Sequence, residues 1–175
     1  MLNPTIAINY AKVILNNKSI DLDKLYTCFI NVKDILNKRP LLDFAFKNQF
    51  ITEENKKELF TSTFDIDNSV TQIFDFIFDN KKANYLSMII DNFLKIYRDK
   101  NKIGEATIIS CSEPSENIKN KIIEILKKDF ELKDIIYNVR IDKNIINGYK
   151  ICINNKMLDM SIEGILKKLE NTILK

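Results

Sequence analysis

The sequence predicts a mainly α-helical protein with a small α/β part, in which an N-terminal six-helix bundle is followed by a C-terminal α/β module with a short sheet. Apolar residues recur every three or four positions up to about residue 103, which is typical of helices that bury one face. After Gly104, short β-branched runs alternate with helical stretches, which indicates strands and helices in one module. We therefore expect two domains, residues 1–103 and 104–175.

Several of the six expected helices have a recognisable start. Asn3 can cap a helix whose first residue is Pro4, where the missing N–H of proline costs nothing. The next three helices are expected to start at or just after Asp21, Pro40 and Thr52. Two more are expected from apolar periodicity, one over residues 70–78 and one that carries apolar residues from 86 to 97.

The expected C-terminal module contains a strand at 106–111, a helix opened by residues 113–115, a strand at 135–141, and a hairpin over 149–158 with its turn at 154–156. Ser161, together with Asp159, is expected to cap a last helix. A serine hydroxyl can accept a hydrogen bond from a free N–H group in the first turn of a helix.

Composition excludes several classes of enzyme. The 175 residues include no histidine, so a Ser-His-Asp triad, a Cys-His pair and a His-ligated metal are ruled out. The three glycines lie too far apart to build a phosphate-binding loop. Asp65, Asp67 and Ser69 begin like a calcium loop, but Val70 and Phe76 stand where such a loop needs glycine and glutamate. We expect no catalytic residue, no metal and no cofactor.

The charge distribution argues against a nucleic-acid partner. Lys and Arg number 27 against 24 Asp and Glu, which gives a net charge of +3. Basic and acidic residues number 15 and 13 up to residue 103, and 12 and 11 after it. Nucleic-acid binders usually concentrate basic residues on one face, and neither part of this chain does so.

Most aromatic residues are expected in the core, and helical spacing places there Phe29, Phe44, Phe60, Phe74, Phe93 and Phe130. The three cysteines are odd in number and lack metal-ligand spacing, so we expect buried free thiols. The fifth expected helix is apolar on nearly all sides. It is either central in the bundle or has a second apolar face for a partner.

The most specific pattern lies in residues 140–166. It contains Asp142, an apolar pair before Asn147-Gly148, an alternating strand, and Asp159-x-Ser161 opening an apolar-rich helix. This pattern resembles the C-terminal signature of the delta subunit of F-type ATP synthase, whose mitochondrial relative is the oligomycin-sensitivity-conferring protein. Tyr10-Ala11-Lys12 and the stretch 77–93 are similar to N-terminal motifs of the same family, so the resemblance covers essentially the whole chain.

The resemblance implies a non-catalytic stator protein. In this family the helical domain binds the N-terminal helix of an ATP synthase α subunit between helices one and five, and the C-terminal domain binds the b subunits of the peripheral stalk. It also implies a single copy in the complex and membrane association only through the complex. The implied location is peripheral, at the cytoplasmic face of the inner membrane or the equivalent face of an organelle membrane.

Carried onto this chain, the groove implied by the resemblance is lined by Tyr10, Ala11, Ile14, Phe74, Ile77 and Phe78. Asp142, Gly148, Asp159 and Ser161 are expected to shape turns and caps. Asn147 and Lys82 depart from the family pattern, which has glycine and commonly arginine there. Two alternatives remain, a non-catalytic helical adaptor with another partner and an RNA-binding helical bundle.

Overall fold

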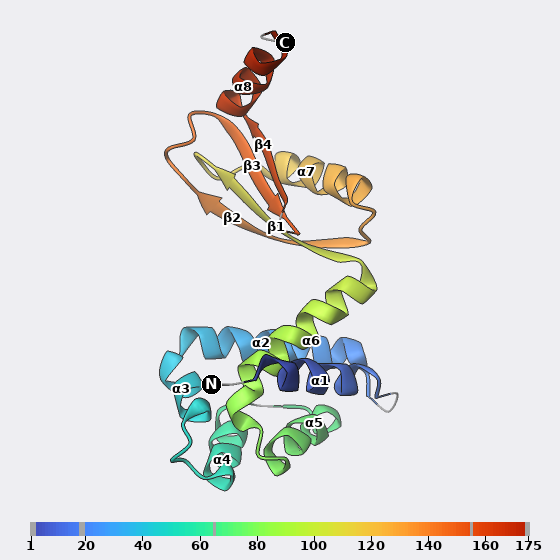
Figure 1. The fold of residues 1–175 in the computed structure, drawn as a ribbon, viewed down its shortest axis with the longest axis vertical. Helices are drawn as coiled ribbons and strands as arrows, with labels where there is room; N and C mark the ends of the chain where they lie inside the picture. The colour runs from blue at the N-terminus through green and yellow to red at the C-terminus, as the bar shows by residue number, and fades with distance from the viewer. Residues whose placement is uncertain (1–2, 18–19, 65, 155, 174–175) are drawn as a thin grey trace. The chain divides into compact units, whose positions relative to one another are not determined.

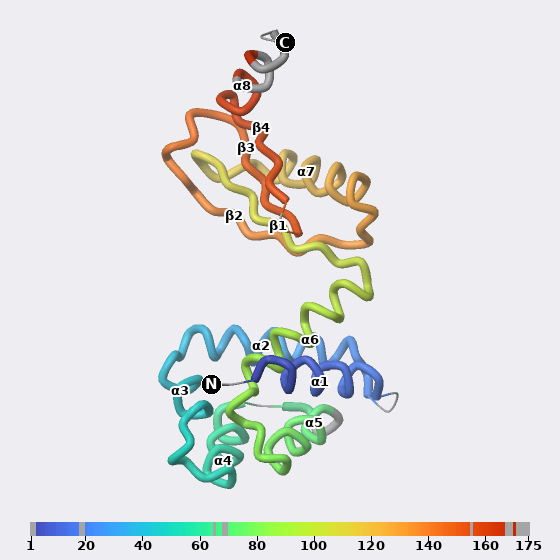
Figure 2. The backbone as a smooth tube through the Cα atoms, in the orientation of Figure 1, coloured from blue at the N-terminus to red at the C-terminus, as the bar shows by residue number. Residues whose placement is uncertain are grey.

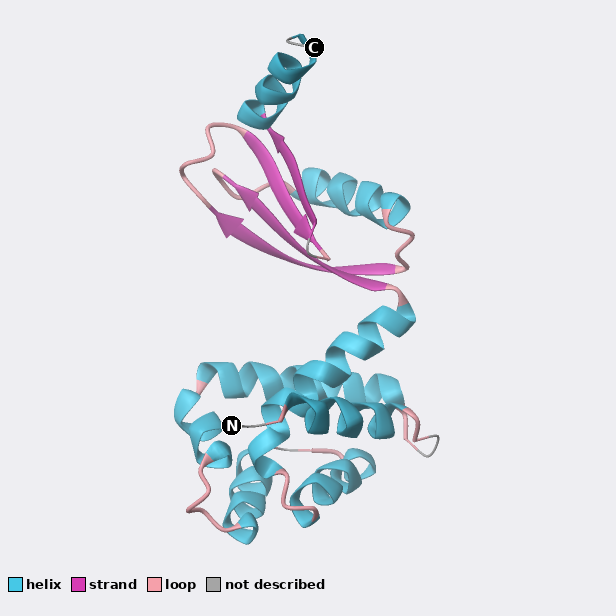
Figure 3. Cartoon of the chain, viewed as in Figure 1, coloured by secondary structure: helices cyan, strands magenta, loops and turns pink. Residues whose placement is uncertain are grey.

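The computed structural model describes residues 3–17, 20–64, 66–154 and 156–173 (Figure 1). The chain divides into two compact units, Met1–Tyr97 and Arg98–Lys175. The first unit is helical, and the second contains a four-stranded mixed sheet with two helices (Figure 3). The expectation of a mainly helical protein with a small α/β part is confirmed.

The helices that precede the sheet are α1 (Pro4–Leu15), α2 (Leu22–Lys38), α3 (Pro40–Lys47), α4 (Glu53–Thr63), α5 (Asn68–Asp79), the 3-10 turn η1 (Ala83–Tyr85) and α6 (Leu86–Asn101). The predicted cap of α1 is confirmed, and α2 and α4 start just after Asp21 and Thr52 as expected. Asn3 accepts from Thr5 N at 3.0 Å, Asp21 accepts from Asp23 N at 3.0 Å, and Thr52 accepts from Asn55 N at 3.3 Å.

The core of the helical unit is built largely from aromatic rings on different helices. Phe29 of α2 meets Phe93 of α6 edge to face, with ring centroids 4.8 Å apart. Phe60 of α4 lies 4.4 Å from Phe74 of α5, again between ring centroids. The expectation for Phe44 is wrong, because it is 66% exposed on the outer side of α3. Phe46 takes the buried position on that helix.

The second unit contains β1 (Ile103–Ser110), α7 (Glu116–Asp129), β2 (Asp134–Ile141), β3 (Gly148–Ile153), β4 (Lys156–Ser161) and α8 (Ile162–Ile173). The strand order is β2-β1-β3-β4, with β1 parallel to β2 and antiparallel to β3. Helix α7 connects the parallel pair and packs on one face of the sheet, where Ile122 and Leu126 meet Ala106, Ile108 and Ile151. These contacts give the unit a core of its own.

The chain passes from α6 into β1 without an intervening loop (Figure 2). Strand β1 begins at Ile103, earlier than the expected residue 106, and includes Gly104. A Cβ on Gly104 would lie 2.4 Å from Leu132 Cδ1, so glycine is required by close packing. The last turn of α6 belongs to the second unit, where Arg98 pairs with Glu105, and Lys133 N donates to Lys102 O at 2.9 Å.

The cysteines are free, as expected, but the expectation that they are buried is wrong. Cys28, Cys111 and Cys152 are each partly exposed. Desolvation raises the pKa of the Cys28 thiol to about 11, so this group stays protonated at neutral pH. The predicted hairpin turn includes Asn155, which lies outside the described residues.

Candidate functional site

The six residues expected to line a groove lie on α1 and α5, but most of them face the protein core. Ala11, Ile14, Phe74, Ile77 and Phe78 are each at most 2% exposed. Phe74 and Phe78 both contact the ring of Phe60 on α4. Tyr10 alone is half-buried. A guest helix therefore cannot touch the five buried side chains in this conformation, and their contact with a partner stays a prediction.

A different set of apolar side chains forms the outer surface between these helices. On α1, Ile6, Tyr10 and Val13 lie at i, i+4 and i+7, so they share one face. Across from them, the ring of Phe76 on α5 lies 5.5 Å from the ring of Tyr10, measured between centroids. Val13 is 58% exposed and Phe76 is 42% exposed. We call Ile6, Tyr10, Val13 and Phe76 the α1–α5 surface.

One feature of the sequence points to this surface, namely the distribution of apolar residues around α5. Helix α5 is apolar on nearly all sides, so one of its apolar residues had to lie off the buried stripe. Phe76 is that residue, because Ile73, Phe74, Ile77 and Phe78 are all buried. Burial alone distinguishes the two faces, and burial depends on neighbouring helices that periodicity does not reveal.

Acidic side chains hold the exposed side of α5 against α4. Lys57 of α4 lies 2.7 Å from Asp75 Oδ1 and 3.6 Å from Asp79 Oδ1 of α5. The hydrogen bond to Asp75 raises the pKa of Lys57, and the two carboxylates add to this. All three groups are solvent-accessible, so the pairs fix the helix position more than they stabilise the fold.

In the second unit, Asp159 and Ser161 form the junction between β4 and α8. Asp159 Oδ1 accepts from Ser161 N at 2.9 Å and from Ser161 Oγ at 2.5 Å. Ser161 Oγ in turn accepts from Gly164 N at 3.1 Å, which caps the first turn of α8. A Cβ on Gly164 would lie 2.5 Å from Asp159 Oδ1, so this carboxylate packs directly on the helix backbone.

Asp142 and Gly148 shape the loop before β3. Asp142 Oδ1 accepts from Asn144 N at 3.0 Å, while Asp142 N donates to Ser110 O at 2.8 Å. Gly148 has φ +95°, and a Cβ there would lie 2.5 Å from Met160 O. Asn147 stands at the family's first glycine position and fits this turn. Its side-chain oxygen accepts from Gly148 N at 2.7 Å, and its carbonyl accepts from Ile162 N at 3.1 Å.

The second unit has exposed apolar residues on β4 and α8. Each is at least 41% exposed, and they are Met157, Met160, Ile162, Ile165 and Leu166. On α8, Ile162, Ile165 and Leu166 lie at i, i+3 and i+4, so they form one stripe. We call the stripe of Ile162, Ile165 and Leu166 the β4–α8 surface. Met157 and Met160 lie three positions apart on β4 and therefore point to opposite faces of the sheet. An exposed apolar stripe on a helix is typical of a protein–protein interface.

The described residues offer little for small-ligand chemistry. Within them, no group of three or more Cys, Asp or Glu side chains is arranged to hold a metal ion. None of the helices formed by those residues is long and apolar enough to cross a membrane. Buried charge is structural: Lys119 on α7 pairs with Glu113 at 2.7 Å and Glu116 at 2.9 Å, which raises its pKa.

The chain is similar to known proteins along nearly its whole length. The family model of the ATP synthase delta (OSCP) subunit matches residues 6–173. The chloroplastic ATP synthase subunit delta of Guillardia theta is 28% identical over 174 residues, covering 96% of this chain and 94% of that protein. The sodium ion specific ATP synthase subunit delta of Propionigenium modestum is 27% identical over 165 residues, covering 93% and 94%.

A solved structure has the same fold. It is a chain of the cryo-EM structure of the Toxoplasma gondii mitochondrial ATP synthase hexamer, with a TM-score of 0.71, 16% identity and 97% of each chain covered. The family model spans both units of the chain described above. The chain therefore belongs to the ATP synthase delta (OSCP) subunit family.

Proposed function

We propose that this peripheral-stalk subunit of F-type ATP synthase ties the catalytic head to the stalk through one interface on each of its units. The observation that carries the proposal is the family match over residues 6–173, which includes both units. The subunit is structural and not catalytic. Its role is to resist rotation of the head, so that the torque of the rotor drives ATP synthesis.

The helical unit, in this proposal, binds the N-terminal helix of an ATP synthase α subunit. The α1–α5 surface supports this, because Val13 and Phe76 offer exposed apolar area on two adjacent helices. An amphipathic helix buries its apolar face in such a position. Ala11, Ile14, Phe74, Ile77 and Phe78 lie in the core of the same two helices, where they keep the surface rigid.

The second unit, in this proposal, binds the ends of the b subunits. The β4–α8 surface supports this, since Ile165 and Leu166 are exposed on a helix that packs mainly against β4 within the described chain. A stalk helix that packs along this stripe would bury its side chains, as two packed helices bury the side chains between them. Asp159 and Ser161 hold the start of α8 and so set the direction in which the stripe is presented.

The remaining features of the proposal follow from this arrangement. A linker between two different partners is needed once in each complex, and it requires no cofactor and no nucleic acid. Its membrane association is then peripheral and passes through the complex, at the cytoplasmic face of a bacterial inner membrane or the equivalent face of an organelle membrane.

The test uses the full chain with two probes, a synthetic peptide of the α-subunit N-terminus and a soluble C-terminal fragment of the b subunits. Val13→Glu places a charge in the α1–α5 surface and is expected to weaken peptide binding at least tenfold, with b binding unchanged. Leu166→Glu is expected to do the reverse. Ile125→Glu, at a 47% exposed position on α7, is the matched control and is expected to change neither.

Two results would contradict the proposal. The first is that the wild-type chain binds neither probe. The second is that it binds both and neither substitution matters. Binding of generic RNA that weakens steeply with salt, in place of the two probes, would favour the RNA-binding alternative.

A further inference from the structure

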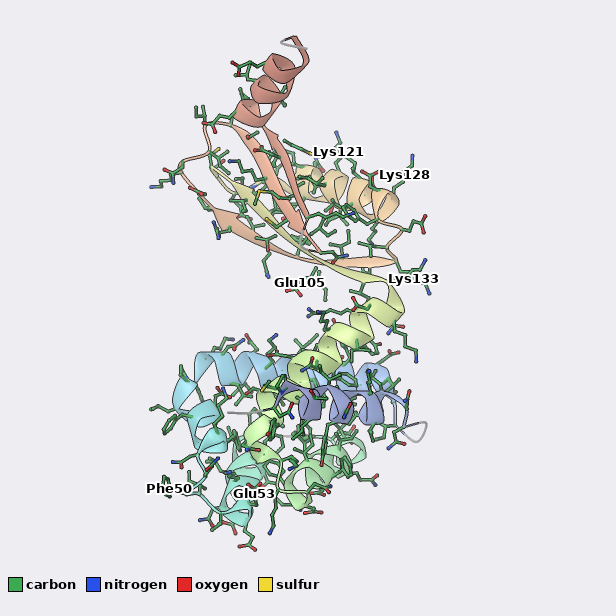
Figure 4. The ribbon with its side chains drawn as sticks, viewed as in Figure 1. Phe50, Glu53, Glu105, Lys121, Lys128 and Lys133 are labelled. Carbon is green, nitrogen blue, oxygen red and sulfur yellow. The ribbon has the colours of Figure 1, made fainter. Side chains whose placement is uncertain are left out.

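The loop between β2 and β3 ends in the one Asn-Gly pair of the sequence, Asn147-Gly148. Figure 4 shows the side chains of this loop projecting outward from the sheet. Asn147 is solvent-exposed, and Gly148 is half-buried at the first position of β3. The side-chain amide of an asparagine can react with the backbone nitrogen of the next residue. Glycine favours this reaction, because the absence of a Cβ leaves its nitrogen open to approach.

The structure brings the two reacting groups into contact. Gly148 N donates a hydrogen bond to Asn147 Oδ1 at 2.7 Å. The carbonyl carbon Cγ is one bond of about 1.23 Å beyond that oxygen, so it lies no more than about 4 Å from the nitrogen. Small rotations about the Cα–Cβ and Cβ–Cγ bonds then turn Cγ toward the nitrogen. They bring the two atoms to the separation of roughly 3–3.5 Å from which such reactions start.

The hydrogen bonds between β3 and β4 leave this nitrogen available. Ile162 N donates to Asn147 O at 3.1 Å. A bond at this position makes Gly148 and Ser161, which face each other across the two strands, a non-hydrogen-bonded pair. The Gly148 N–H therefore points away from β4, and the partner that the structure gives it is the Asn147 side chain itself. No hydrogen bond to β4 has to break before the nitrogen reacts.

Close packing fixes the glycine of this pair. Gly148 has φ +95°, and a Cβ there would lie 2.5 Å from Met160 O, so no other residue fits without strain. The family pattern has glycine at the preceding position too, and Asn147 is where this chain departs from it. The reactive amide is thus a feature of this chain and not of the family pattern.

We propose that Asn147 is a site of spontaneous covalent modification, at which the side-chain amide becomes a carboxyl group through a cyclic imide. Gly148 N loses its proton to base in the solvent and attacks Asn147 Cγ. The new N–Cγ bond forms, the bond from Cγ to Nδ2 breaks, and Nδ2 takes up a proton and leaves as ammonia. Water then opens the ring, so that one water is consumed and one ammonia is released overall.

The ring can open in two ways, and the products differ in their effect on the fold. Aspartate keeps the original main chain, and its carboxylate can accept the same bond from Gly148 N. Isoaspartate adds one carbon to the main chain before Gly148, where β4 is too close to admit even a Cβ. It is expected to displace the carbonyl of residue 147 from Ile162 N, at the first residue of α8. The start of α8 is then less firmly held.

The experiment incubates the folded full-length chain in mildly alkaline buffer and follows the tryptic peptide 144–150 by mass spectrometry. This peptide contains an internal control, Asn144, which is also exposed. Asn144 is followed by the β-branched Ile145, whose N–H donates to Asp142 O at 3.2 Å. Asn147→Gln is the matched variant, because its longer side chain would have to close a larger and less favourable ring.

Conversion of amide to acid at Asn147 is expected to be at least about tenfold faster than at Asn144, and to speed up with pH because the attacking nitrogen must lose its proton. Asn147→Gln is expected to slow conversion at this position by at least about tenfold. Enzymatic methylation, which detects isoaspartate, is expected to label the incubated wild-type chain. In that chain, the Ile162 N–H is expected to exchange faster than in a fresh sample.

Conversion at Asn147 in the urea-unfolded chain but not in the folded chain would overturn the proposal, since the fold would then protect this amide. Equal rates at Asn144 and Asn147 would also contradict it, because the contact with Gly148 would give no advantage. Unchanged exchange of Ile162 in a sample rich in isoaspartate would show that the assigned effect on α8 is wrong. All readouts use the isolated chain, so they are independent of the binding probes that test the proposed function.

Discussion

At the scale of single residues, the positions that sequence predicts best are those whose role is local. Asn3 and Ser161 are expected as caps, and helices are expected to start just after Asp21 and Thr52. Each of the four accepts a backbone N–H within the next three residues. Such bonds depend on residue type and immediate neighbours, which the sequence contains. Exposure is a different property, since it depends on which helices meet. That is why Phe44 was wrongly expected in the core and Val13 and Phe76 were missed.

The cap at Ser161 can be tested by removing one oxygen. Ser161→Ala deletes the acceptor for Gly164 N and the donor to Asp159, so we expect it to destabilise α8 by about 1 kcal/mol. Amide hydrogen exchange over α8 is expected to speed up accordingly. Ser115→Ala is the control, because Ser115 stands at the N-cap of α7 without a side-chain capping bond. Equal effects of the two substitutions would contradict this role of Ser161.

At the scale of elements, α6 is a helix that the sequence predicts, but the sequence does not predict how it begins or ends. The apolar periodicity predicted this helix, and its residues Ile89, Ile90 and Phe93 are buried as expected. The periodicity did not predict that a 3-10 turn, η1, precedes it, or that β1 follows it directly at Ile103. Lys102 ends the helix with φ 55°, a conformation that glycine or asparagine usually takes, so the usual sign of a helix end is missing.

Helices α2 and α6 are joined by Tyr97, and this contact should make stability depend on pH. Tyr97 donates a hydrogen bond to Asp23 and stacks on Tyr26 with ring centroids 4.4 Å apart. Burial, and then the bond to Asp23, raise the pKa of Tyr97 from 10.0 to about 12. The folded state thus holds this proton more tightly than the unfolded state. The stabilisation is complete below pH 10 and is lost as pH rises towards 12.

The measurement is urea unfolding of wild type and Tyr97→Phe from pH 8 to pH 12. Wild type is expected to be more stable than the variant at pH 8, and the difference is expected to shrink above pH 10. Lysines titrate in the same range, but they do so in both proteins and cancel in the comparison. A difference that stays constant to pH 12 would contradict the assignment.

The packing of α1 against its neighbours predicts opposite results for two nearby substitutions. Ala11 is fully buried, so Ala11→Glu forces a carboxylate into an apolar core and is expected to cost about 3–5 kcal/mol. Val13 is exposed two positions later, and Val13→Glu is expected to change stability by less than about 0.5 kcal/mol. Thermal unfolding followed by circular dichroism measures both. A folded and stable Ala11→Glu variant would mean that Ala11 faces a groove after all.

At the scale of the whole molecule, the sequence predicted the order of helices and strands because periodicity changes once, near Gly104. It did not give the division exactly, since the expected boundary follows residue 103 and the structure divides after Tyr97. The difference arises from contacts at the end of α6: the Arg98 side chain pairs with Glu105 of β1, and the backbone carbonyl of Lys102 accepts from Lys133 N. Pairings of this kind depend on the folded sheet and cannot be read from composition.

The division leads to a prediction about fragments of the chain. The helical unit has its own aromatic core, so residues 1–103 are expected to unfold cooperatively when expressed alone, and to bind the α-subunit N-terminal peptide with the affinity of the full chain. A fragment of residues 1–97 ends at Tyr97, where the last turn of α6 no longer holds that side chain. We expect it to fold with lower stability and to lose most of the stabilising effect of the Tyr97–Asp23 bond.

Urea unfolding of both fragments, with Tyr97→Phe made in each, measures this directly. The substitution is expected to cost less in the shorter fragment than in the longer one. An aggregating 1–103 fragment would show instead that the helical unit needs the sheet to fold, and an equal cost in both fragments would show that Tyr97 is held without the turn that follows it.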